Sequence, residues 1–201
     1  MSKLGSSDNP LKVAIVGAGP SGFYAADALI TSELKVEVNL IEKLCAPYGL
    51  VRTGVAPDHP LIKKSIEKFA VMAEPEEFNY FGNVAVGKDI TVDQLKESHH
   101  AVIITMGAET DRKLGIPGED LKGSHTATEF VAWYNGHPEY REREFDLSHE
   151  TAVIIGQGNV AADVARILSK TVDELKCTDI SQHALDVLED SKVKNIYVVG
   201  R

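Results

Sequence analysis

Apolar and polar positions in this chain follow two periodicities that alternate along the sequence. Apolar runs rich in β-branched residues predict buried strands at residues 12–16, 36–41, 101–105, 151–156 and 195–199. Apolar residues at helical spacing predict helices at residues 21–30, 61–72, 92–97, 129–134, 159–168 and 182–188. Short strands are expected within residues 80–86, and the Gly- and Pro-rich segment 45–60 is expected to be irregular. Strands that alternate with helices predict an α/β fold.

Two of the predicted strands are each followed by a glycine-rich turn and an alanine-rich helix. The first turn reads Gly17-Ala18-Gly19-Pro20-Ser21-Gly22, and the second reads Gly156-Gln157-Gly158-Asn159-Val160-Ala161. In such turns the first glycine allows a tight bend, the second lets the backbone approach a pyrophosphate, and the third lets helix and strand pack closely. The free N–H groups of the helix then face the phosphates. The sequence therefore predicts two dinucleotide sites, an arrangement suited to electron transfer between two cofactors.

The residues at the ends of the neighbouring strands differ between the two sites. Glu42 ends the strand 36–41, where a carboxylate accepts hydrogen bonds from ribose hydroxyls and repels a 2′-phosphate. This predicts FAD or NAD in the first site, and the alternative is an ordinary glycine loop with a solvated glutamate. Arg201 follows the strand 195–199, where a guanidinium either pairs with a 2′-phosphate and selects NADP or is simply solvated.

The two sites predict two Rossmann-like domains. We expect an FAD-binding domain in residues 1–111 and an NADP-binding domain in residues 112–201. A doubly wound sheet normally continues beyond a single βαβ unit, because one unit leaves strand edges and a sheet face uncovered. Both domains are therefore expected to be incomplete, with the C-terminal part of the protein absent from this sequence.

Composition narrows the class of protein. The 201 residues are 43% hydrophobic, which is enough for a packed core, and the net charge of −9 argues against nucleic acid or an anionic membrane as a partner. Cys45 and Cys177 form no C-x-x-C pair, and the histidines lack metal-ligand spacing, so no metal site is expected. We find no secretory or transit peptide and no apolar run that would span a membrane, and we expect a cytoplasmic protein.

Several longer strings resemble the adrenodoxin reductase family, the ferredoxin–NADP reductases of glutathione-reductase-like architecture. They are YGLVR at residues 48–52, GVAPDHP at 54–60, FVAWYNGHP at 130–138 and GQGNVAADVAR at 156–166. Together with the first glycine turn they cover nearly the whole chain. The resemblance implies an FAD enzyme that takes hydride from NADPH and passes single electrons to a ferredoxin-type iron–sulfur protein.

The resemblance also implies roles for individual residues. FAD would be held by Gly17, Gly19, Pro20, Ser21, Gly22, Glu42, Gly49, Leu50 and Val51. NADP would be held by Gly156, Gln157, Gly158, Asn159, Val160 and Arg201. His59 would lie near the isoalloxazine ring and Asp163 near the nicotinamide, as a catalytic pair on a proton path. The residues alone leave a plainer alternative open, in which His59 fixes a turn and Asp163 orients the start of a helix.

Two other functions stay open at this stage. A related NAD(P)H flavin reductase would serve another acceptor; those that feed amidotransferases carry an N-terminal cysteine-rich cluster domain, which this sequence lacks. A truncated chain would instead be a non-catalytic nucleotide-binding fragment. Reduction of flavin by NADPH distinguishes these possibilities.

Overall fold

The computed structural model describes residues 3–108 and 110–200. These residues form two compact units. The first unit holds the described residues before Thr53 together with Leu61–Ala108, and the second holds Thr53–Pro60 together with the described residues after Ala108. Each unit contains parallel strands with helices packed against them. The predicted α/β fold is therefore confirmed.

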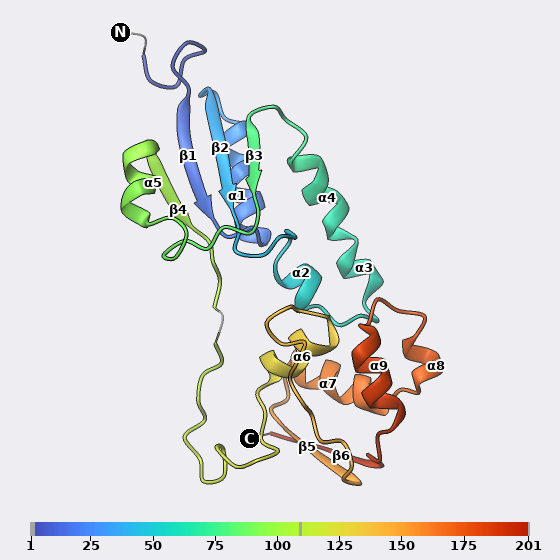
Figure 1. Ribbon diagram of the computed structural model, residues 1–201. Coiled ribbons are helices and arrows are strands. Elements are labelled where there is room, and N and C mark those ends of the chain that lie inside the picture. The colour runs from blue at the N-terminus through green and yellow to red at the C-terminus, as the bar shows by residue number, and fades with distance from the viewer. Residues whose placement is uncertain (1–2, 109, 201) are drawn as a thin grey trace. The chain divides into compact units, whose positions relative to one another are not determined.

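The first unit is built on a four-stranded parallel sheet in the order β3-β2-β1-β4 (Figure 1). The strands are β1 (Leu11–Val16), β2 (Val36–Ile41), β3 (Phe78–Phe81) and β4 (Ala101–Ile104). Val16 lies opposite Ile41 in the register of β1 and β2, so these two strands end side by side. The residues that follow them, Gly17 and Glu42, are therefore brought to the same edge of the sheet.

Helices cover the two faces of this sheet differently, because successive side chains of a strand point to opposite faces. Helix α1 (Pro20–Ile30) and helix α4 (Ser65–Met72) pack on one face, where Phe23 and Phe69 lie with their ring centroids 5.3 Å apart. Helix α5 (Val92–Ser98) packs Leu95 against the other face. Thr91 and Gln94 form a capping box that fixes the start of α5.

The structure differs from the predicted elements in three places of this unit. The helix expected at 61–72 is divided into α3 (Pro60–Lys63) and α4, because the Ser65 hydroxyl donates a hydrogen bond to the carbonyl of Ile62 at 2.7 Å and so competes with the helical pattern. A short helix, α2 (Leu50–Thr53), lies in the segment expected to be irregular. The strand expected within 80–86 ends at Phe81, since Asn83 adopts a φ of +59° and turns the chain.

The second unit contains two parallel strands, β5 (Thr151–Ile155) and β6 (Asn195–Val199). Its helices are α6 (Ala127–Tyr134), α7 (Asn159–Ser169), α8 (Val172–Leu175) and α9 (Gln182–Glu189). Helix α8 is a single turn that the sequence pattern did not predict. The core of this unit includes the side chains of Trp133 from α6, Phe145 from the loop before β5, Ile167 from α7 and Leu185 from α9. The apolar faces of these helices therefore meet in one core.

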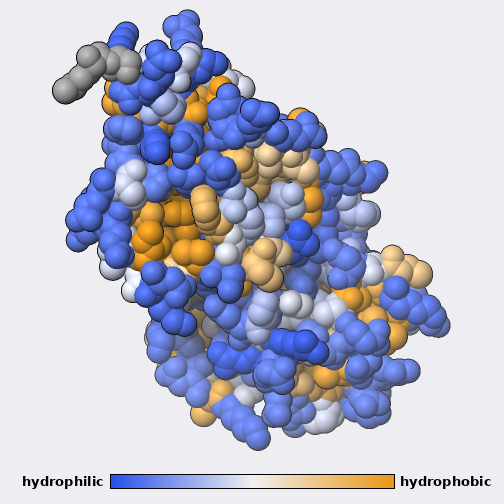
Figure 2. All heavy atoms as spheres, turned by 45° about the horizontal axis from the view of Figure 1, so that its top comes forward, coloured by the Kyte–Doolittle hydropathy of each residue, from blue (hydrophilic) through white to orange (hydrophobic). Residues whose placement is uncertain are grey.

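The surface is mainly hydrophilic, with apolar residues gathered in a few areas of the face shown in Figure 2. One face of the β5–β6 pair is open to solvent: Val153 and Ile155 are each 61% exposed, and Tyr197, opposite Val153, is 59% exposed. Among the described residues, no helix has both the length and the apolar character needed to cross a membrane.

Candidate functional site

The first glycine turn follows β1 and depends on Gly17. Its φ of +107° favours glycine, and a Cβ at this position would lie 2.6 Å from the carbonyl oxygen of Thr105. The N–H of Gly17 donates to the carbonyl of Ile41 at 2.8 Å. This bond fastens the turn to the end of β2 and brings it beside Glu42.

Gly22 and Gly19 have opposite surroundings in the same turn. A Cβ on Gly22 would lie 2.1 Å from the carbonyl oxygen of Gly17, so this position must be glycine for the helix to pack on the strand. A Cβ on Gly19 would meet nothing within 4 Å. Pro20 is the first residue of α1, and Ser21 beside it is exposed. The turn therefore leaves an open approach to the backbone at the helix N-terminus, where a phosphate fits.

Glu42 is held in place by two backbone N–H groups. Its Oε2 accepts from Ala18 at 2.8 Å, and its Oε1 accepts from Leu44 at 3.1 Å. Each carboxylate oxygen has a second lone pair, so the group retains capacity for ribose hydroxyls. The structure thus places the predicted acid directly against the predicted glycine turn.

The segment after Glu42 packs back onto the same turn. Tyr48 has a φ of +87°, and its N–H donates to the carbonyl of Ala18 at 2.8 Å. A Cβ on Gly49 would lie 2.9 Å from the Cα of Gly19. The next two residues differ, because Leu50 is 69% exposed and Val51 is buried. Gly49 therefore packs directly against the first turn, and Val51 joins Ala18 in the core beneath it.

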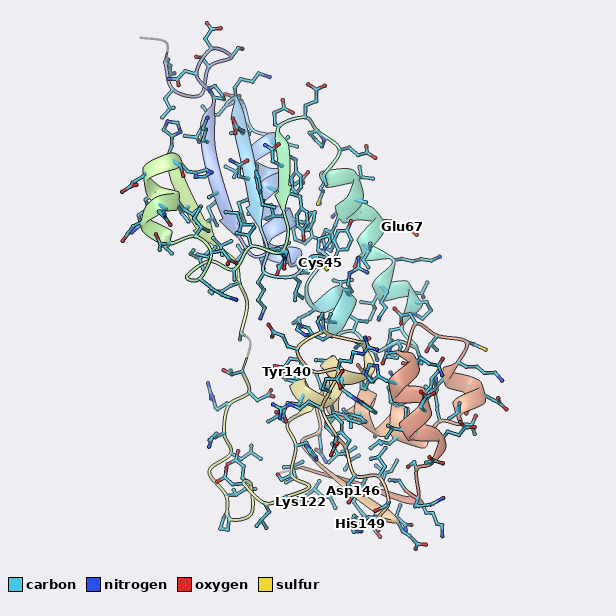
Figure 3. All side chains as sticks on the ribbon, viewed as in Figure 1. Cys45, Glu67, Lys122, Tyr140, Asp146 and His149 are labelled. Atoms are coloured by element: carbon cyan, nitrogen blue, oxygen red, sulfur yellow. The ribbon has the colours of Figure 1, made fainter. Side chains whose placement is uncertain are left out.

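Both cysteines are free thiols and are exposed. Cys45 lies in the connection between β2 and α2 (Figure 3). The described residues contain no cluster of three or more His, Cys, Asp or Glu side chains that could hold a metal ion. His149, for example, pairs with Asp146 at 3.7 Å on an exposed loop (Figure 3).

The second glycine turn repeats the geometry of the first. Gly156 has a φ of +127°, and its N–H donates to the carbonyl of Val199 at 2.8 Å. Gly158 precedes α7 with φ −81° and ψ 177°, and Gly19 precedes α1 with φ −80° and ψ −177°. A Cβ on Gly158 would again meet nothing within 4 Å. Three other predicted site residues of this turn are exposed: Gln157, Asn159 and Val160.

The two turns differ in the residue that lies opposite the first glycine. Ile155 pairs with Val199, so Gly200 follows β6 where Glu42 follows β2. A Cβ on Gly200 would lie 2.2 Å from the side chain of Gln157, which therefore rests against this glycine. Arg201 comes next in the sequence and lies outside the described residues. No carboxylate side chain stands at this position of the second turn.

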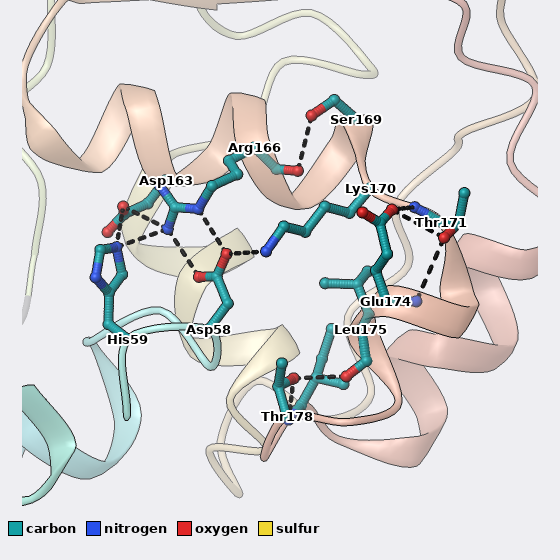
Figure 4. A network of polar contacts seen from close by, with 11 residues as sticks. Asp58, His59, Asp163, Arg166, Ser169, Lys170, Thr171, Glu174, Leu175 and Thr178 are labelled. Carbon is teal, nitrogen blue, oxygen red and sulfur yellow. Dashed lines mark hydrogen bonds and ion pairs between the residues drawn. The ribbon is translucent and has the colours of Figure 1, made fainter. Parts of the chain in front are cut away.

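Helix α7 and the segment 53–60 of the second unit share a network of charged side chains (Figure 4). Arg166 forms a fork on Asp58, with Nε 2.6 Å from Oδ2 and Nη2 2.8 Å from Oδ1. Lys170 Nζ lies 2.7 Å from the same Oδ2. The predicted pair meets in this network, with His59 Nε2 3.1 Å from Asp163 Oδ1.

Electrostatics stabilise the charged forms of this network. The fork from Arg166, aided by Lys170, holds the pKa of Asp58 well below its usual range, and the same fork raises the pKa of Arg166. Burial, helped by the nearby charge of Asp163, raises the pKa of Tyr134. The Tyr134 hydroxyl is buried and has no hydrogen-bond partner among the residues that the structure describes. It therefore remains a neutral hydroxyl close to the charged groups.

Sequence reasoning missed three members of this network: Asp58, Arg166 and Lys170. A signal was present on the helix, because Asp163, Arg166 and Lys170 are spaced by three and four residues and so share one face. The shared partner of Arg166 and Lys170, the carboxylate of Asp58, could not be predicted from the spacing of residues, because Asp58 precedes Arg166 by 108 residues.

The first unit also contains an apolar cavity of about 210 Å³. It is lined by Asn39, Ile41, Phe81, Val84, Ile90, Leu95 and His99. No residue of the glycine turn lines it, and its walls offer few groups that would bind a phosphate. The two turns therefore remain the candidate nucleotide sites.

The sequence profile of the pyridine nucleotide-disulphide oxidoreductase family matches residues 11–198, a range that contains both turns. The chain belongs to this family. Within the family, it is 55% identical over 190 residues to the mitochondrial NADPH:adrenodoxin oxidoreductase of Salvelinus fontinalis, which covers 94% of the chain and 38% of that relative. The NADPH-ferredoxin reductase FprA of Mycobacterium leprae (strain TN) is 50% identical over 194 residues, covering 94% of the chain and 42% of that protein.

A solved family structure agrees with these sequence matches. FprA of Mycobacterium tuberculosis in complex with NADPH has a TM-score of 0.92 and 49% identity, covering 96% of the chain and 44% of that structure. The resemblance to the adrenodoxin reductases is therefore confirmed. The chain spans about two fifths of the length of the relatives that it matches.

Gly22→Ala and Gly19→Ala form a matched pair of steric tests in one turn. We expect Gly22→Ala to lower the free energy of unfolding by roughly 1–3 kcal/mol or more, because its Cβ collides with a backbone carbonyl. Gly19→Ala should change it by less than about 0.5 kcal/mol. Urea unfolding followed by far-UV circular dichroism measures both. Equal losses would contradict the open approach at Gly19.

Asp58→Asn should destabilise the protein in a pH-dependent way. At pH 7 the loss should be roughly 1–3 kcal/mol, because two partly buried donors, Arg166 and Lys170, lose a charged partner. The lowered pKa of Asp58 gives the folded state stability at pH values above the ordinary carboxyl range, and this stability is lost as the pH falls below about 4. The variant should therefore show a flatter decline of stability in acid.

Trp133 provides the measurement, since it is the single tryptophan and is buried in the second unit. Its fluorescence during urea unfolding, recorded between pH 3 and 7, gives the two stability curves. Asp173→Asn is the control, because it removes an exposed ion pair with Lys176 on α8. A change of more than about 0.5 kcal/mol in the control, or parallel curves for Asp58→Asn and the native chain, would argue against the network.

Proposed function

We propose that the protein is an FAD-dependent oxidoreductase that takes hydride from NADPH and passes single electrons to a ferredoxin-type iron–sulfur protein. The observation that carries this proposal is the pair of equivalent glycine turns with unlike neighbours, Glu42 in one and Gly200 in the other. The relatives support it, since they are named NADPH:adrenodoxin oxidoreductase and NADPH-ferredoxin reductase. Two unlike dinucleotides in one chain suit a hydride acceptor and a hydride donor.

FAD is assigned to the first turn. The carboxylate of Glu42 suits a ribose with free hydroxyls, and the open backbone at Gly19 suits a pyrophosphate. The residues proposed to hold it are Gly17, Gly19, Pro20, Ser21, Gly22, Glu42, Gly49, Leu50 and Val51. The tight contact between Gly49 and Gly19 supports this group as one site.

NADP is assigned to the second turn. Gly200 offers no negative charge to repel a 2′-phosphate, and Arg201 after it supplies a cation. The residues proposed to hold the nucleotide are Gly156, Gln157, Gly158, Asn159, Val160 and Arg201. We assign residues 1–111 to the FAD-binding domain and residues 112–201 to the NADP-binding domain, with Thr53–Pro60 contributing His59 to the second unit.

His59 and Asp163 are proposed as the catalytic pair. Bound flavin supplies the conversion of a two-electron donor into single-electron steps. The protein supplies a place for the accompanying proton, and an imidazole exchanges protons near neutral pH. His59 Nε2 holds or releases that proton against Asp163 Oδ1, 3.1 Å away.

A cytoplasmic location is also part of the proposal. Exposed free thiols such as Cys45 and Cys177 are typical of proteins in a reducing compartment. The relative from Salvelinus fontinalis is named mitochondrial, which makes the mitochondrion the competing location. Fractionation of cells that produce the full-length protein separates the two, and recovery with mitochondria would contradict the cytoplasmic assignment.

The deciding experiment is an absorption spectrum of the purified protein with FAD, before and after anaerobic NADPH. We expect a flavin band that NADPH bleaches and that a ferredoxin-type protein then restores. Glu42→Ala should lower flavin occupancy, whereas Glu67→Ala, which removes a carboxylate from α4 of the same unit, should not (Figure 3). Flavin that NADPH reduces but ferredoxin cannot reoxidise would favour a reductase with another acceptor. Failure of a full-length protein to bind flavin would leave only nucleotide binding.

Arg201→Ala tests the choice of nucleotide. Loss of a charge-assisted contact with the 2′-phosphate should weaken NADPH binding roughly 10- to 100-fold and leave NADH binding nearly unchanged. Titration of the intrinsic NADPH and NADH fluorescence gives both dissociation constants. Arg141→Ala, an exposed arginine of the same unit, is the matched control. If Arg201→Ala weakened the binding of NADPH and NADH equally, Arg201 would not be a ligand of the 2′-phosphate.

A further inference from the structure

Asp58 is the most enclosed charge of the second unit's network. Its side chain is 5% exposed, while those of Arg166, Lys170 and Asp163 are 31, 28 and 21% exposed. Three charge-assisted bonds satisfy it, two from Arg166 and one from Lys170. A buried carboxylate with this many donors has a single favourable position, because any displacement leaves a charge unpaired.

The backbone around Asp58 is equally fixed. His59 donates its N–H to the carbonyl of Ala56 at 3.0 Å, which closes a turn, and both Ala56 and Pro57 are buried. Asp58 lies inside this turn and His59 follows it directly. The ion pair therefore determines where the His59 backbone lies relative to α7.

Arg166 links this ion pair to the proposed catalytic pair. Its Nη2 lies 2.8 Å from Asp58 Oδ1, 2.8 Å from Asp163 Oδ1 and 2.8 Å from His59 Nε2. Nη2 carries two N–H groups, and one of them completes the fork on Asp58. The other is then directed at Asp163 Oδ1 and His59 Nε2, the two atoms that are 3.1 Å apart.

We propose that Asp58 is a positioning residue, which acts through the guanidinium of Arg166 to fix His59 Nε2 against Asp163. Lys170 occupies the second lone pair of Asp58 Oδ2 and keeps the fork from rotating. The inference rests on the proposed function of His59 and Asp163. It requires the planar fork of an arginine, because the single ammonium nitrogen of a lysine at position 166 cannot present two parallel N–H groups to the Asp58 carboxylate.

The charges around His59 give this arrangement a second property. Asp58 and Asp163 are matched by Arg166 and Lys170, and the Tyr134 hydroxyl near them is neutral. The network is therefore balanced when the imidazole is neutral and carries one positive charge when it is protonated. Moving Arg166 away from His59 changes both the geometry and the field at Nε2.

The test is nitrogen-15 NMR of the arginine Nε–H and histidine ring signals of the chain without nucleotide. In the native chain the Arg166 Nε–H, which donates to Asp58, should exchange slowly with solvent. In Asp58→Asn we expect its exchange to be roughly tenfold faster or more, because the charged acceptor is lost. The ring nitrogens of His59 should shift in the same spectrum, while those of the other six histidines stay in place.

Three further variants make the result specific. Arg166→Lys keeps the positive charge but loses the fork, so it should shift the His59 signals as Asp58→Asn does. Lys170→Arg keeps a donor to Asp58 and should leave the His59 signals near their native positions. Asp173→Asn, the exposed control on α8, should change neither signal. If Asp58→Asn does not fold, Arg166→Lys alone decides the matter.

Unchanged His59 signals in a folded Asp58→Asn or Arg166→Lys variant would overturn the proposal and leave the ion pair a purely stabilising contact. The spectra need no flavin, so their result is independent of the reductase assignment. Shifted His59 signals in a protein whose flavin NADPH fails to reduce would retain the positioning role and refute the catalytic one. In an active enzyme, Asp58→Asn should lower kcat with the KM for NADPH unchanged, which a general loss of nucleotide binding would not do.

Discussion

The backbone hydrogen bond that joins each glycine turn to its neighbouring strand is the interaction on which both candidate sites depend. Gly17 donates to Ile41 and Gly156 donates to Val199, each at 2.8 Å. The positive φ of these glycines turns the chain out of the strand directly after the bonded N–H, in a conformation where an L side chain would be strained. This bond sets the helix N-terminus and the next residue of the neighbouring strand side by side, so the chemistry of each site follows from what that residue is.

Much of this arrangement could be predicted from the sequence because it is local. A β-branched run, a glycine turn and a helix pattern are contiguous, and in the first site the end of the next strand also lies close along the chain, with Glu42 following Gly22 by 20 residues. The first and second turns were predicted in this way, together with Glu42. The interruption between α3 and α4 was not, since it depends on one hydroxyl of Ser65 that bonds backwards to Ile62. The periodicity of apolar residues indicates which face of a helix is buried, but it does not reveal a side-chain bond that competes with the helical hydrogen bonds.

The charged network marks the limit of sequence reasoning more clearly. His59 and Asp163 were predicted through family resemblance, but their meeting depends on Asp58 and Arg166, which are 108 residues apart. Nothing in the composition of the Gly- and Pro-rich segment indicates that its last part, Thr53–Pro60, packs with the second unit. The ion pair between Asp58 and Arg166 holds this segment against helix α7, and it is visible only in the structure. Its burial adds the further requirement that every oxygen of Asp58 has a donor, a condition visible only in three dimensions.

The contact between Gln157 and Gly200 has a consequence for how the second site could change over evolution. A side chain at Gly200 would occupy the space where Gln157 now rests, with the added Cβ 2.2 Å from the Gln157 side chain. An acid introduced there to favour an unphosphorylated ribose would therefore meet a steric obstacle before it met a ligand. The long Gln157 side chain can rotate away, but only by giving up its present packing. Any side chain introduced at Gly200 therefore has to displace Gln157, so the effect of a substitution at one of these two positions depends on the residue at the other.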